Sequence, residues 1–422
     1  MKRKVRYAAR RRRLTRQTTV LGALAVAGLA GIAVVLGVTW GPAKSSFDGF
    51  VYVESNRLGR NTILAYRFRH SRFEPIGEFS TAGSGVVDFD IEGSLDAQDQ
   101  IVVDPRRRLL FAVNQGSDSI AVFHLQRNGR PVAVLGSPFA AGGKAPGSLA
   151  LAGPFLIVVD KAQDTRRDLH AVRPTYRAFR IGARGALTPA GKAFRSDAFA
   201  SPTAAFPLTP RLLVTTEEAG PFRTLLLGPD GSITQGPNSP LAPEASIFRP
   251  RYDGARWSIG LARHPRLPLV YANQSATRQL VVYRFGPSGG LTFVRAVRNT
   301  HSRLPCWTVV SADGKRLFTA NAGNGSVTSF DLSGDPTRPR RVQAFPLRAA
   351  ANPWGLALDP SGRTLFVVDA RADTEAPLKR GNRLHAVHVD SDGKLRELRD
   401  SPVKLPVSRS DSSPLGIAVL PR

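Results

Sequence analysis

Cysteine is nearly absent from this chain, because its 422 residues include only Cys306. A single cysteine cannot close an intramolecular disulfide, and it cannot supply the several thiolates of a zinc ribbon, so both kinds of small stapled domain are excluded. The hydrophobic share of 42% and the charged share of 22% are those of a folded globular protein. Disorder, collagen and coiled coil are therefore excluded as descriptions of the whole chain.

Acidic residues are also scarce, since 32 of them face 59 lysines and arginines and leave a net charge of +27. The first 44 residues carry ten basic side chains and no acid, so the remainder keeps about +17. Nucleic acid is not a predicted partner, because no helix-turn-helix, RNA-binding aromatic signature or zinc finger is present. If the domain is exported, as the N-terminal region discussed next predicts, anionic lipid or an anionic envelope polymer is a better-placed partner. Arginine nevertheless outnumbers lysine by 49 to 10, which favours a compositional bias spread over the surface.

The N-terminal region combines a basic segment with an apolar run. Residues 1–17 carry nine basic side chains and no acid, and residues 18–40 are uncharged and mostly apolar. About 20 apolar residues span a bilayer as a helix with the basic flank on the cytoplasmic side, so we predict a transmembrane anchor at 18–40 and an exported body. Cleavage as a signal peptide is the alternative, since Gly41 and Ala43 have the spacing that a signal peptidase reads. The arginine-rich flank is also compatible with twin-arginine export.

One structural unit recurs along the exported part: an apolar strand, a turn, a second apolar strand ending in a polar residue, a polar loop and an alternating third strand. Dipeptides such as Asn128-Gly129 and Asp392-Gly393 follow the third strand and accept the positive φ angles of a tight hairpin. They therefore predict a turn into a fourth strand. The second strands are the clearest copies. They occupy residues 50–54, 110–114, 156–160, 213–217, 269–273, 317–321 and 365–369.

The two ends of this repeat series complete each other. The unit at residues 50–54 lacks a first strand, whereas residues 416–420 form a first strand with no unit after it. Such circular closure is expected where four-stranded sheets are arranged radially. No kelch diglycine or WD40 Trp-Asp signature recurs, and no long amphipathic helix follows Trp40. We therefore predict an all-β fold, a seven-bladed β-propeller over residues 50–422, joined to the membrane segment by a linker at 41–49.

The blade-building residues resemble those of a known family. Residues 359–369, 104–114, 119–123 and 185–189 are similar to the repeat of the lactonase-type propellers, which include the propeller form of 6-phosphogluconolactonase and a muconate-lactonizing enzyme. The resemblance covers nearly all of residues 50–422. It implies a seven-bladed propeller and, for function, chemistry on a lactone.

Polar residues end the second strands at equivalent places. Their carboxylates and amides would form a collar that holds a cation or polarises a bound water. The alternative, which repetition in every blade favours, is that each side chain caps the turn after it. The resemblance distinguishes Glu217, which matches an Asn-Glu position of the lactonase-like repeat with Thr216 in place of the asparagine. The seven residues are Glu54, Asn114, Asp160, Glu217, Asn273, Asn321 and Asp369.

Lactonase-like propellers usually place a histidine directly after the proline that enters a first strand, and this sequence contains no Pro-His pair. A lactonase needs a base to activate water and a donor to stabilise the oxyanion. Without that histidine, the candidate base is Glu217, with Arg251, Arg256 or Arg303 holding an anionic group of the substrate. The alternative for each arginine is a solvated position on the surface.

The histidines are scattered and show no metal-ligand spacing such as HExxH. His264 and His301 lie near predicted blade entrances and are the remaining acid-base candidates. Trp307 and Trp354 lie at similar entrances, where they would either stack on a sugar or aromatic ring or pack between blades. Cys306 is interpreted as a small buried apolar residue. No metal site and no cofactor are predicted.

Two functions remain open at this point. The first is an exported lactonase-like propeller that hydrolyses a sugar or organic-acid lactone, and the second is a non-catalytic propeller of the cell envelope that binds a ligand or a protein. Fold alone does not decide between them, because propellers host both classes. The missing histidine weakens the first hypothesis, and the membrane segment with the basic surface motivates the second.

Overall fold

The computed structural model describes most of the chain beyond the N-terminal segment. The described residues are 44–87, 94–164, 166–169, 171–198, 200–218, 222–239, 258–370, 380–407 and 411–422. The predicted membrane segment at 18–40 lies outside them. Among the described residues, no helix combines the length and the apolarity that a bilayer crossing requires.

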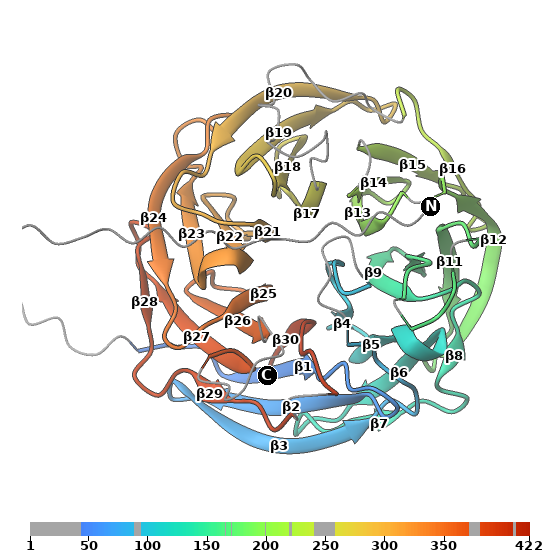
Figure 1. Ribbon diagram of the computed structural model, residues 1–422, viewed down its shortest axis with the longest axis horizontal. Coiled ribbons are helices and arrows are strands. Elements are labelled where there is room, and N and C mark those ends of the chain that lie inside the picture. The colour runs from blue at the N-terminus through green and yellow to red at the C-terminus, as the bar shows by residue number, and fades with distance from the viewer. Residues whose placement is uncertain are drawn as a thin grey trace, which may run out of the picture. The chain divides into compact units, whose positions relative to one another are not determined.

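Seven antiparallel sheets radiate from a central channel, which confirms the predicted seven-bladed β-propeller (Figure 1). Blade 1 consists of β30 (Ile417–Pro421), β1 (Gly49–Glu54), β2 (Thr62–Arg69) and β3 (Arg72–Ser80). Blade 2 consists of β4 (Ile101–Asp104), β5 (Leu109–Asn114), β6 (Ser119–Leu125), β7 (Pro131–Ala133) and the short β8 (Phe139–Ala140). Blade 3 consists of β9 (Pro146–Ala152), β10 (Phe155–Asp160), β11 (Thr175–Ile181) and β12 (Leu187–Arg195).

The remaining four blades repeat the same order from the channel outward. Blade 4 consists of β13 (Pro202–Thr209), β14 (Leu212–Glu217), β15 (Arg223–Leu227) and β16 (Ile233–Gln235), and blade 5 of β17 (Ser258–Arg263), β18 (Leu269–Gln274), β19 (Gln279–Phe285) and β20 (Leu291–Arg298). Blade 6 consists of β21 (Pro305–Val310), β22 (Arg316–Asn321), β23 (Ser326–Asp331) and β24 (Arg340–Pro346). Blade 7 consists of β25 (Asn352–Leu358), β26 (Thr364–Ala370), β27 (Arg383–Val389), β28 (Leu395–Glu397) and the short β29 (Val403–Lys404).

Two short 3₁₀ helices, η1 (Gln115–Ser117) and η2 (Ala322–Asn324), follow second strands. We call the face where second strands end the upper face. The opposite, lower face carries the turns that connect first to second strands and third to fourth strands.

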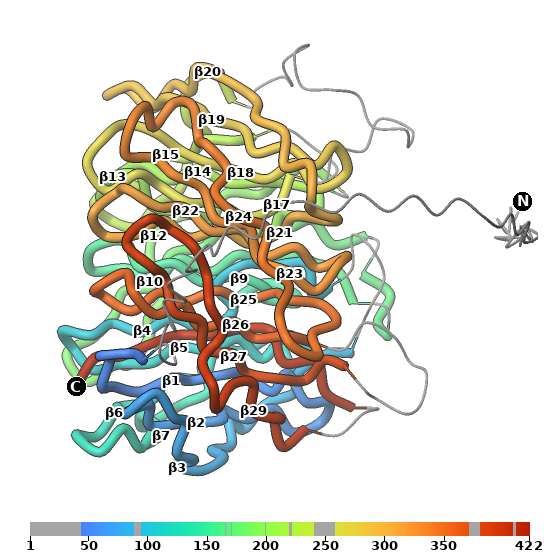
Figure 2. The backbone as a smooth tube through the Cα atoms, turned by 90° about the vertical axis from the view of Figure 1, so that its left-hand side faces the viewer, coloured from blue at the N-terminus to red at the C-terminus, as the bar shows by residue number. Residues whose placement is uncertain are grey.

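Blade 1 is closed by the C-terminal strand, as the sequence predicts. β30 pairs antiparallel with β1, and Pro421 lies opposite Gly49 while Ile417 lies opposite Val53. Beyond the pair, the Arg422 amide donates to the Asp48 carbonyl oxygen at 3.3 Å. Figure 2 shows the C-terminal end of the chain beside the start of β1. The two ends of the repeat series therefore share one sheet, which joins the ring.

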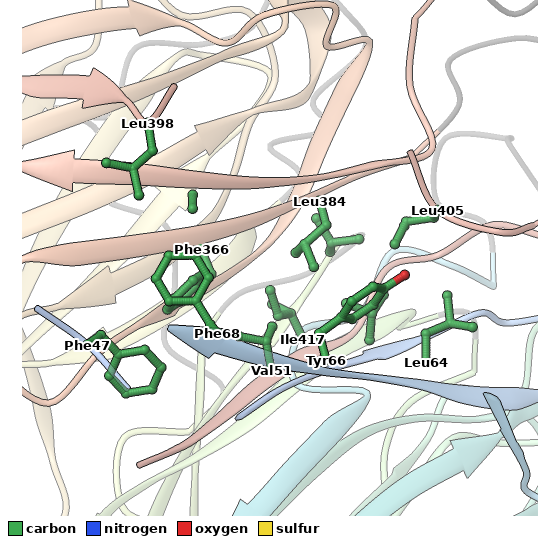
Figure 3. Packing of buried hydrophobic residues seen from close by; sticks show 13 residues of the cluster. Phe47, Val51, Leu64, Tyr66, Phe68, Phe366, Leu384, Leu398, Leu405 and Ile417 are labelled. Atoms are coloured by element: carbon green, nitrogen blue, oxygen red, sulfur yellow. The ribbon is translucent and has the colours of Figure 1, made fainter. Parts of the chain in front are cut away.

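Apolar clusters between neighbouring blades form the core. The cluster between blades 7 and 1 contains a group of phenylalanines, in which Phe68 and Phe366 meet edge to face with ring centroids 4.9 Å apart (Figure 3). Phe47 joins them, with its ring centroid 5.5 Å from that of Phe366. Both Phe68 and Phe366 have no exposed surface. Such aromatic pairs contribute about 0.5–1.5 kcal/mol beyond the area that they bury, so this seam is well fixed.

The Asn128-Gly129 turn illustrates why the sequence places glycine in these hairpins. Gly129 has a φ of 84°, and a Cβ at this position would lie 2.2 Å from the ring of Phe50. Its carbonyl oxygen accepts a hydrogen bond from the Tyr52 hydroxyl at 2.9 Å. Only glycine combines this backbone angle with such a close approach, so the turn binds blade 2 to blade 1.

Candidate functional site

A short segment fills the central channel. Residues 94–100, which we call the channel plug, connect blade 1 to blade 2 and bond to the first strands of three other blades. The Gln98 amide donates to the Thr203 carbonyl oxygen at 2.8 Å, and the Gln98 side chain exchanges two hydrogen bonds with the Leu261 backbone. The Leu149 amide donates to the Asp99 carbonyl oxygen at 2.9 Å. The plug thus ties β9, β13 and β17 together from inside the ring.

The residues that directly follow the polar strand ends are also buried. Because side chains alternate along a strand, each of them points to the side opposite its neighbour. Two of them reach the plug, since Lys161 Nζ donates to the Asp96 carbonyl oxygen at 2.8 Å and Gln115 Nε2 donates to the Ser94 carbonyl oxygen. The full set, at equivalent positions in seven blades, is Ser55, Gln115, Lys161, Glu218, Gln274, Ala322 and Ala370.

Four of the residues beside the plug form a polar group that we call the mouth cluster: Asp96, Lys161, Ser201 and Glu218. Lys161 Nζ lies 3.0 Å from Glu218 Oε2, and neither side chain has any exposed surface. The Ser201 hydroxyl donates to the same oxygen at 2.5 Å. The cluster therefore holds one ammonium group against one carboxylate oxygen, in surroundings where electrostatic interactions are strong.

Glu218 also faces a second acid. The Asp96 side chain lies close enough to Glu218 to lower its pKa, although Glu218 Oε1 has no hydrogen-bond partner among the described residues. Burial raises the pKa of Glu218, and the neighbouring Lys161, Ser201 and Asp96 oppose this shift only in part. A buried carboxyl group with a raised pKa beside an ammonium group is a usual component of general acid–base chemistry.

Glu217, the predicted base, lies between blades 3 and 4 and is occupied by structural bonds. Its carboxylate accepts from Arg223 Nε at 3.2 Å, from the Tyr176 hydroxyl at 3.2 Å and from the Ser196 hydroxyl at 2.5 Å. Arg223 Nη2 donates to its second oxygen at 3.3 Å. The chain turns the adjacent Glu218, and not Glu217, toward the plug. Sequence reasoning missed Glu218, Lys161 and Asp96, although the alternation from Glu217 to Glu218 was a signal that could have found the first.

The two histidine candidates lie on opposite faces. His264 follows β17 at the lower face, where its Nδ1 accepts from the backbone amides of Arg266 and Leu267 at 3.2 and 3.0 Å. Burial lowers its pKa. His301 is exposed on the upper face, and its carbonyl oxygen accepts from Asn324 Nδ2 at 3.1 Å. The structure therefore does not bring His264 together with Glu217 or Glu218, and it uses the ring of His264 to hold a turn.

The candidate arginines and tryptophans do not gather in one site. Arg303 is exposed beside His301, and its amide donates to Asn324 Oδ1 at 3.2 Å. Trp307 is 3% exposed and packs against Trp354 with ring centroids 5.7 Å apart, so these two form one apolar wall of the channel. Arg251 and Arg256 lie outside the described residues.

Cys306 lies in the same wall and is buried. Burial raises the pKa of its thiol strongly, and the carboxyl groups of Asp96 and Glu218 act in the same direction. The thiolate is the nucleophilic form of cysteine. Cys306 therefore serves as a small apolar residue, in agreement with its interpretation from the sequence.

The polar strand ends bond to neighbouring strands and blades. Asn61 Nδ2 donates to Glu54 at 2.7 Å, the Thr175 hydroxyl donates to Asp160 at 2.6 Å, and Asn273 Nδ2 donates across to the Cys306 carbonyl oxygen in blade 6. Burial raises the pKa values of Glu54 and Asp160 to about 8. A protonated carboxyl is a poor ligand for a cation, so these contacts favour a structural role. Within the described ranges, no three or more His, Cys, Asp or Glu side chains gather as a metal would require.

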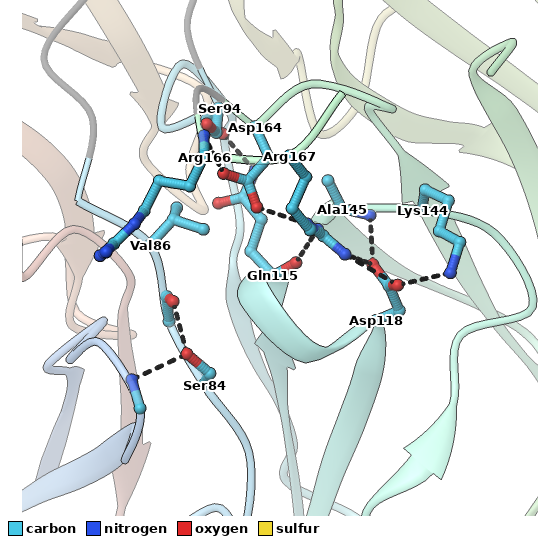
Figure 4. Close-up of polar contacts among 12 residues, drawn as sticks. Ser84, Val86, Ser94, Gln115, Asp118, Lys144, Ala145, Asp164, Arg166 and Arg167 are labelled. Atoms are coloured by element: carbon cyan, nitrogen blue, oxygen red, sulfur yellow. Dashed lines mark hydrogen bonds and ion pairs between the residues drawn. The ribbon is translucent and has the colours of Figure 1, made fainter. Parts of the chain in front are cut away.

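A salt-bridged loop covers the upper face next to the mouth cluster (Figure 4). Arg167 Nη1 bonds to both carboxylate oxygens of Asp118 at 2.9 Å, its Nε lies 2.6 Å from Asp164, and its Nη2 donates to the Gln115 carbonyl oxygen at 2.9 Å. Lys144 Nζ adds a contact of 2.9 Å to Asp118. Arg167 thus fastens the loop after β10 to blade 2, close in sequence to Lys161, which directly follows this strand.

A cavity of about 170 Å³ lies on the other side of the plug, toward the lower face. Residues 97–100 of the plug form its upper wall, and the first strands of five blades form its sides. Those strands contribute Phe206 from β13, residues 261–263 from β17, residues 307–310 from β21, residues 355 and 356 from β25, and Ile417 from β30 with the two residues before it. The plug therefore separates this cavity from the mouth cluster.

Comparison with known proteins supports the resemblance seen in the sequence. Residues 258–375 match the model of the family described as Lactonase, 7-bladed beta-propeller. No curated protein sequence matches the chain. Among solved structures, the periplasmic gluconolactonase of Pseudomonas aeruginosa has a TM-score of 0.65 at 15% identity, over 88% of this chain and 99% of that one.

A second similar structure is a protein from Bacteroides fragilis provisionally assigned as a 6-phosphogluconolactonase. It has a TM-score of 0.65 at 14% identity, over 90% of this chain and 100% of that one. Identities this low establish the fold alone. The family match and the blade architecture together confirm that this chain resembles the lactonase-type seven-bladed β-propellers, with the match to the family model at residues 258–375.

Proposed function

We propose that this protein hydrolyses a sugar or organic-acid lactone at the upper mouth of the channel. The observation that carries the proposal is the mouth cluster, in which the buried Glu218 carboxyl lies 3.0 Å from the buried Lys161 ammonium and beside a second acid, Asp96. The match to the lactonase family and the shared fold of the Pseudomonas aeruginosa gluconolactonase point to the same class of substrate.

The cluster contains the groups that lactone hydrolysis requires. Water attacks the carbonyl carbon of the ring ester while the ionised Glu218 carboxylate accepts a proton from it. The Lys161 ammonium stabilises the negative charge that develops on the carbonyl oxygen. When the ring C–O bond breaks, the departing alkoxide takes a proton from the acid, and the product is the open-chain hydroxy acid. Lys161 thereby takes the role for which the sequence suggested an arginine.

The Glu218→Gln variant tests this mechanism. It keeps the size of the side chain and removes its ability to exchange a proton, so we expect hydrolysis of a panel of sugar and aliphatic lactones to fall by about 10²–10⁴-fold in kcat/KM. Initial rates are measured by release of acid with the full-length protein. Glu74→Gln is the matched control, because Glu74 lies on the outer strand β3, where its side chain is 42% exposed and pairs with Arg69.

Equal activity of Glu218→Gln and the unmodified protein would refute a catalytic role for the mouth cluster. The second candidate function, a non-catalytic envelope propeller, is favoured by one observation: Lys161 and Glu218 have no exposed surface, and the plug occupies the channel beside them. Absence of turnover on every lactone, by protein whose unfolding is cooperative, would establish that second function as the better account.

We further propose that the propeller is exported and held at the membrane by residues 18–40. In bacterial cells that express the full chain, we expect the protein to remain with membranes after an alkaline wash and to be digested by protease added to spheroplasts. Recovery of full-length protein in the medium would indicate cleavage of the segment. A protein that stays in the soluble cell extract and resists protease until the cells are lysed would contradict export.

A further inference from the structure

The cavity below the plug has two polar residues of the plug, Asp99 and Gln100, in its wall. Gln100 lines the cavity and is 1% exposed, yet its Oε1 accepts no hydrogen bond in the part of the chain that the structure describes. Buried side-chain oxygens in folded proteins nearly always have a donor. Gln100 Oε1 is therefore an unsatisfied acceptor behind the cavity wall, where a ligand in the cavity does not reach it.

Asp99 is the second polar residue of this wall. Its Oδ2 accepts one hydrogen bond, from Gln98 Nε2 at 3.2 Å, and no lysine or arginine pairs with it among the described residues. Burial raises its pKa to about 6, because the charged carboxylate is poorly solvated there. A half-buried carboxylate of this kind gains from a cation that reaches it.

The rest of the lining is mostly apolar, and it includes one basic residue, Arg263, whose Nε has no hydrogen-bond partner among the described residues. Phe206, Leu261, Trp307 and Leu356 contribute the apolar surface, and the Thr308 hydroxyl accepts from Asn273 Nδ2 at 2.6 Å. The basic residue of the lining, Arg263, holds its guanidinium 5.8 Å from the ring centroid of Phe285 in β19. The cavity volume, about 170 Å³, is similar to that of cavities that hold a molecule of the size of benzene.

We propose that this cavity binds a small primary amine with an apolar body. The ammonium group donates to the Asp99 carboxylate, and the apolar part packs against Phe206, Trp307 and Leu356. A carboxylate that accepts one hydrogen bond from the protein keeps further acceptor positions for an ammonium group, and aromatic rings in the wall favour a cation near their faces. The site is independent of the proposed hydrolysis, because the plug lies between the cavity and the mouth cluster.

Calorimetric titration of the full-length protein with benzylamine and with benzyl alcohol tests the proposal. The two compounds have nearly the same shape, and only the amine carries a charge at pH 7.5. We expect benzylamine to bind at least about tenfold more tightly than benzyl alcohol, since a charge-assisted hydrogen bond is about twice as strong as a neutral one. Asp99→Asn should reduce this preference to less than about twofold.

Asp392→Asn is the matched control, because Asp392 lies in an exposed turn of the lower face and should leave the preference unchanged. Equal affinity for the two compounds, or no binding of either, would overturn the proposal with the unmodified protein alone, whether or not Asp99→Asn folds. Retention of the preference in a folded Asp99→Asn protein would also overturn it. Lactone hydrolysis, measured on the same samples, should be unaffected by Asp99→Asn.

Discussion

Replacement of Lys161 by methionine is expected to lower the free energy of unfolding by about 3–5 kcal/mol at pH 7, one of the two largest effects predicted for this protein. Methionine fills much of the same volume but leaves the Glu218 carboxylate buried without its cation, and the Asp96 carbonyl oxygen without its donor at 2.8 Å. Unfolding in guanidinium chloride, followed by tryptophan fluorescence, measures the change.

The same variant should show a characteristic dependence on pH. Without Lys161, the folded-state pKa of Glu218 rises further above its unfolded value, so the destabilisation grows as the pH rises above about 4.5 and is smallest in acid. The Lys161→Met, Glu218→Gln double variant removes both charges and should recover part of the lost stability. A loss that is equal at pH 5 and pH 8, or a double variant less stable than either single variant, would contradict this electrostatic account.

Removal of residues 416–422 is expected to abolish cooperative folding. The deletion takes away β30, the first strand of blade 1, with the buried side chains Ile417, Ala418 and Leu420 and the ladder to β1. Burial of two such large aliphatic side chains contributes about 3–6 kcal/mol, and the lost ladder adds to this. The sum approaches the whole stability of a typical domain, about 5–15 kcal/mol.

Thermal denaturation by circular dichroism and the solubility of the truncated protein measure this effect. Deletion of Arg422 alone is the control, because this residue is exposed and contributes a single 3.3 Å hydrogen bond to Asp48. It should leave the melting temperature within about 2 °C. A truncated protein that melts cooperatively near the temperature of the full chain would show that closure by β30 is dispensable.

The fold could be predicted because its evidence is repeated. Seven copies of one strand pattern, each bounded by turn dipeptides, identify the blades, and the unmatched strands at the two ends predict the closure that β1 and β30 form. Each copy is a weak signal by itself. An error of one residue in the predicted position of a strand still leaves a predicted strand, so prediction of the fold does not require the exact register.

The site could not be predicted in the same way, because register decides it. The polar residue at the end of β14 was identified, but the structure places Glu217 between blades and turns Glu218 to the plug. The plug itself breaks the repeat, so no blade pattern marks Asp96 or Asp99. His264 lies at the lower face because it follows a first strand, whereas Glu217 lies at the upper face because it ends a second strand. The spacing of these residues in the sequence does not show that they lie at opposite faces.

Unlike a Pro-His pair, the Lys161–Glu218 pair of the mouth cluster cannot be recognised as a local sequence motif. Lys161 and Glu218 occupy equivalent positions in adjacent blades, one residue after the strand ends, and they meet only because those blades are neighbours around the channel. An ion pair between residues 57 positions apart in sequence leaves no local motif. Such an ion pair can be identified only when the order of the blades around the channel is known.

Closure of blade 1 by β30 also has a consequence for synthesis of the chain. During translation, β1 emerges before the other strands of the propeller, while its inner partner, β30, emerges after them. Blades 2 to 7 are encoded in between, so the ring remains open until β30 has been made. Throughout that time the edge of β1 is unpaired and able to capture a strand of another chain. Closure of blade 1 is therefore the last step in assembly of the ring, and it is the step at which aggregation competes with the native fold.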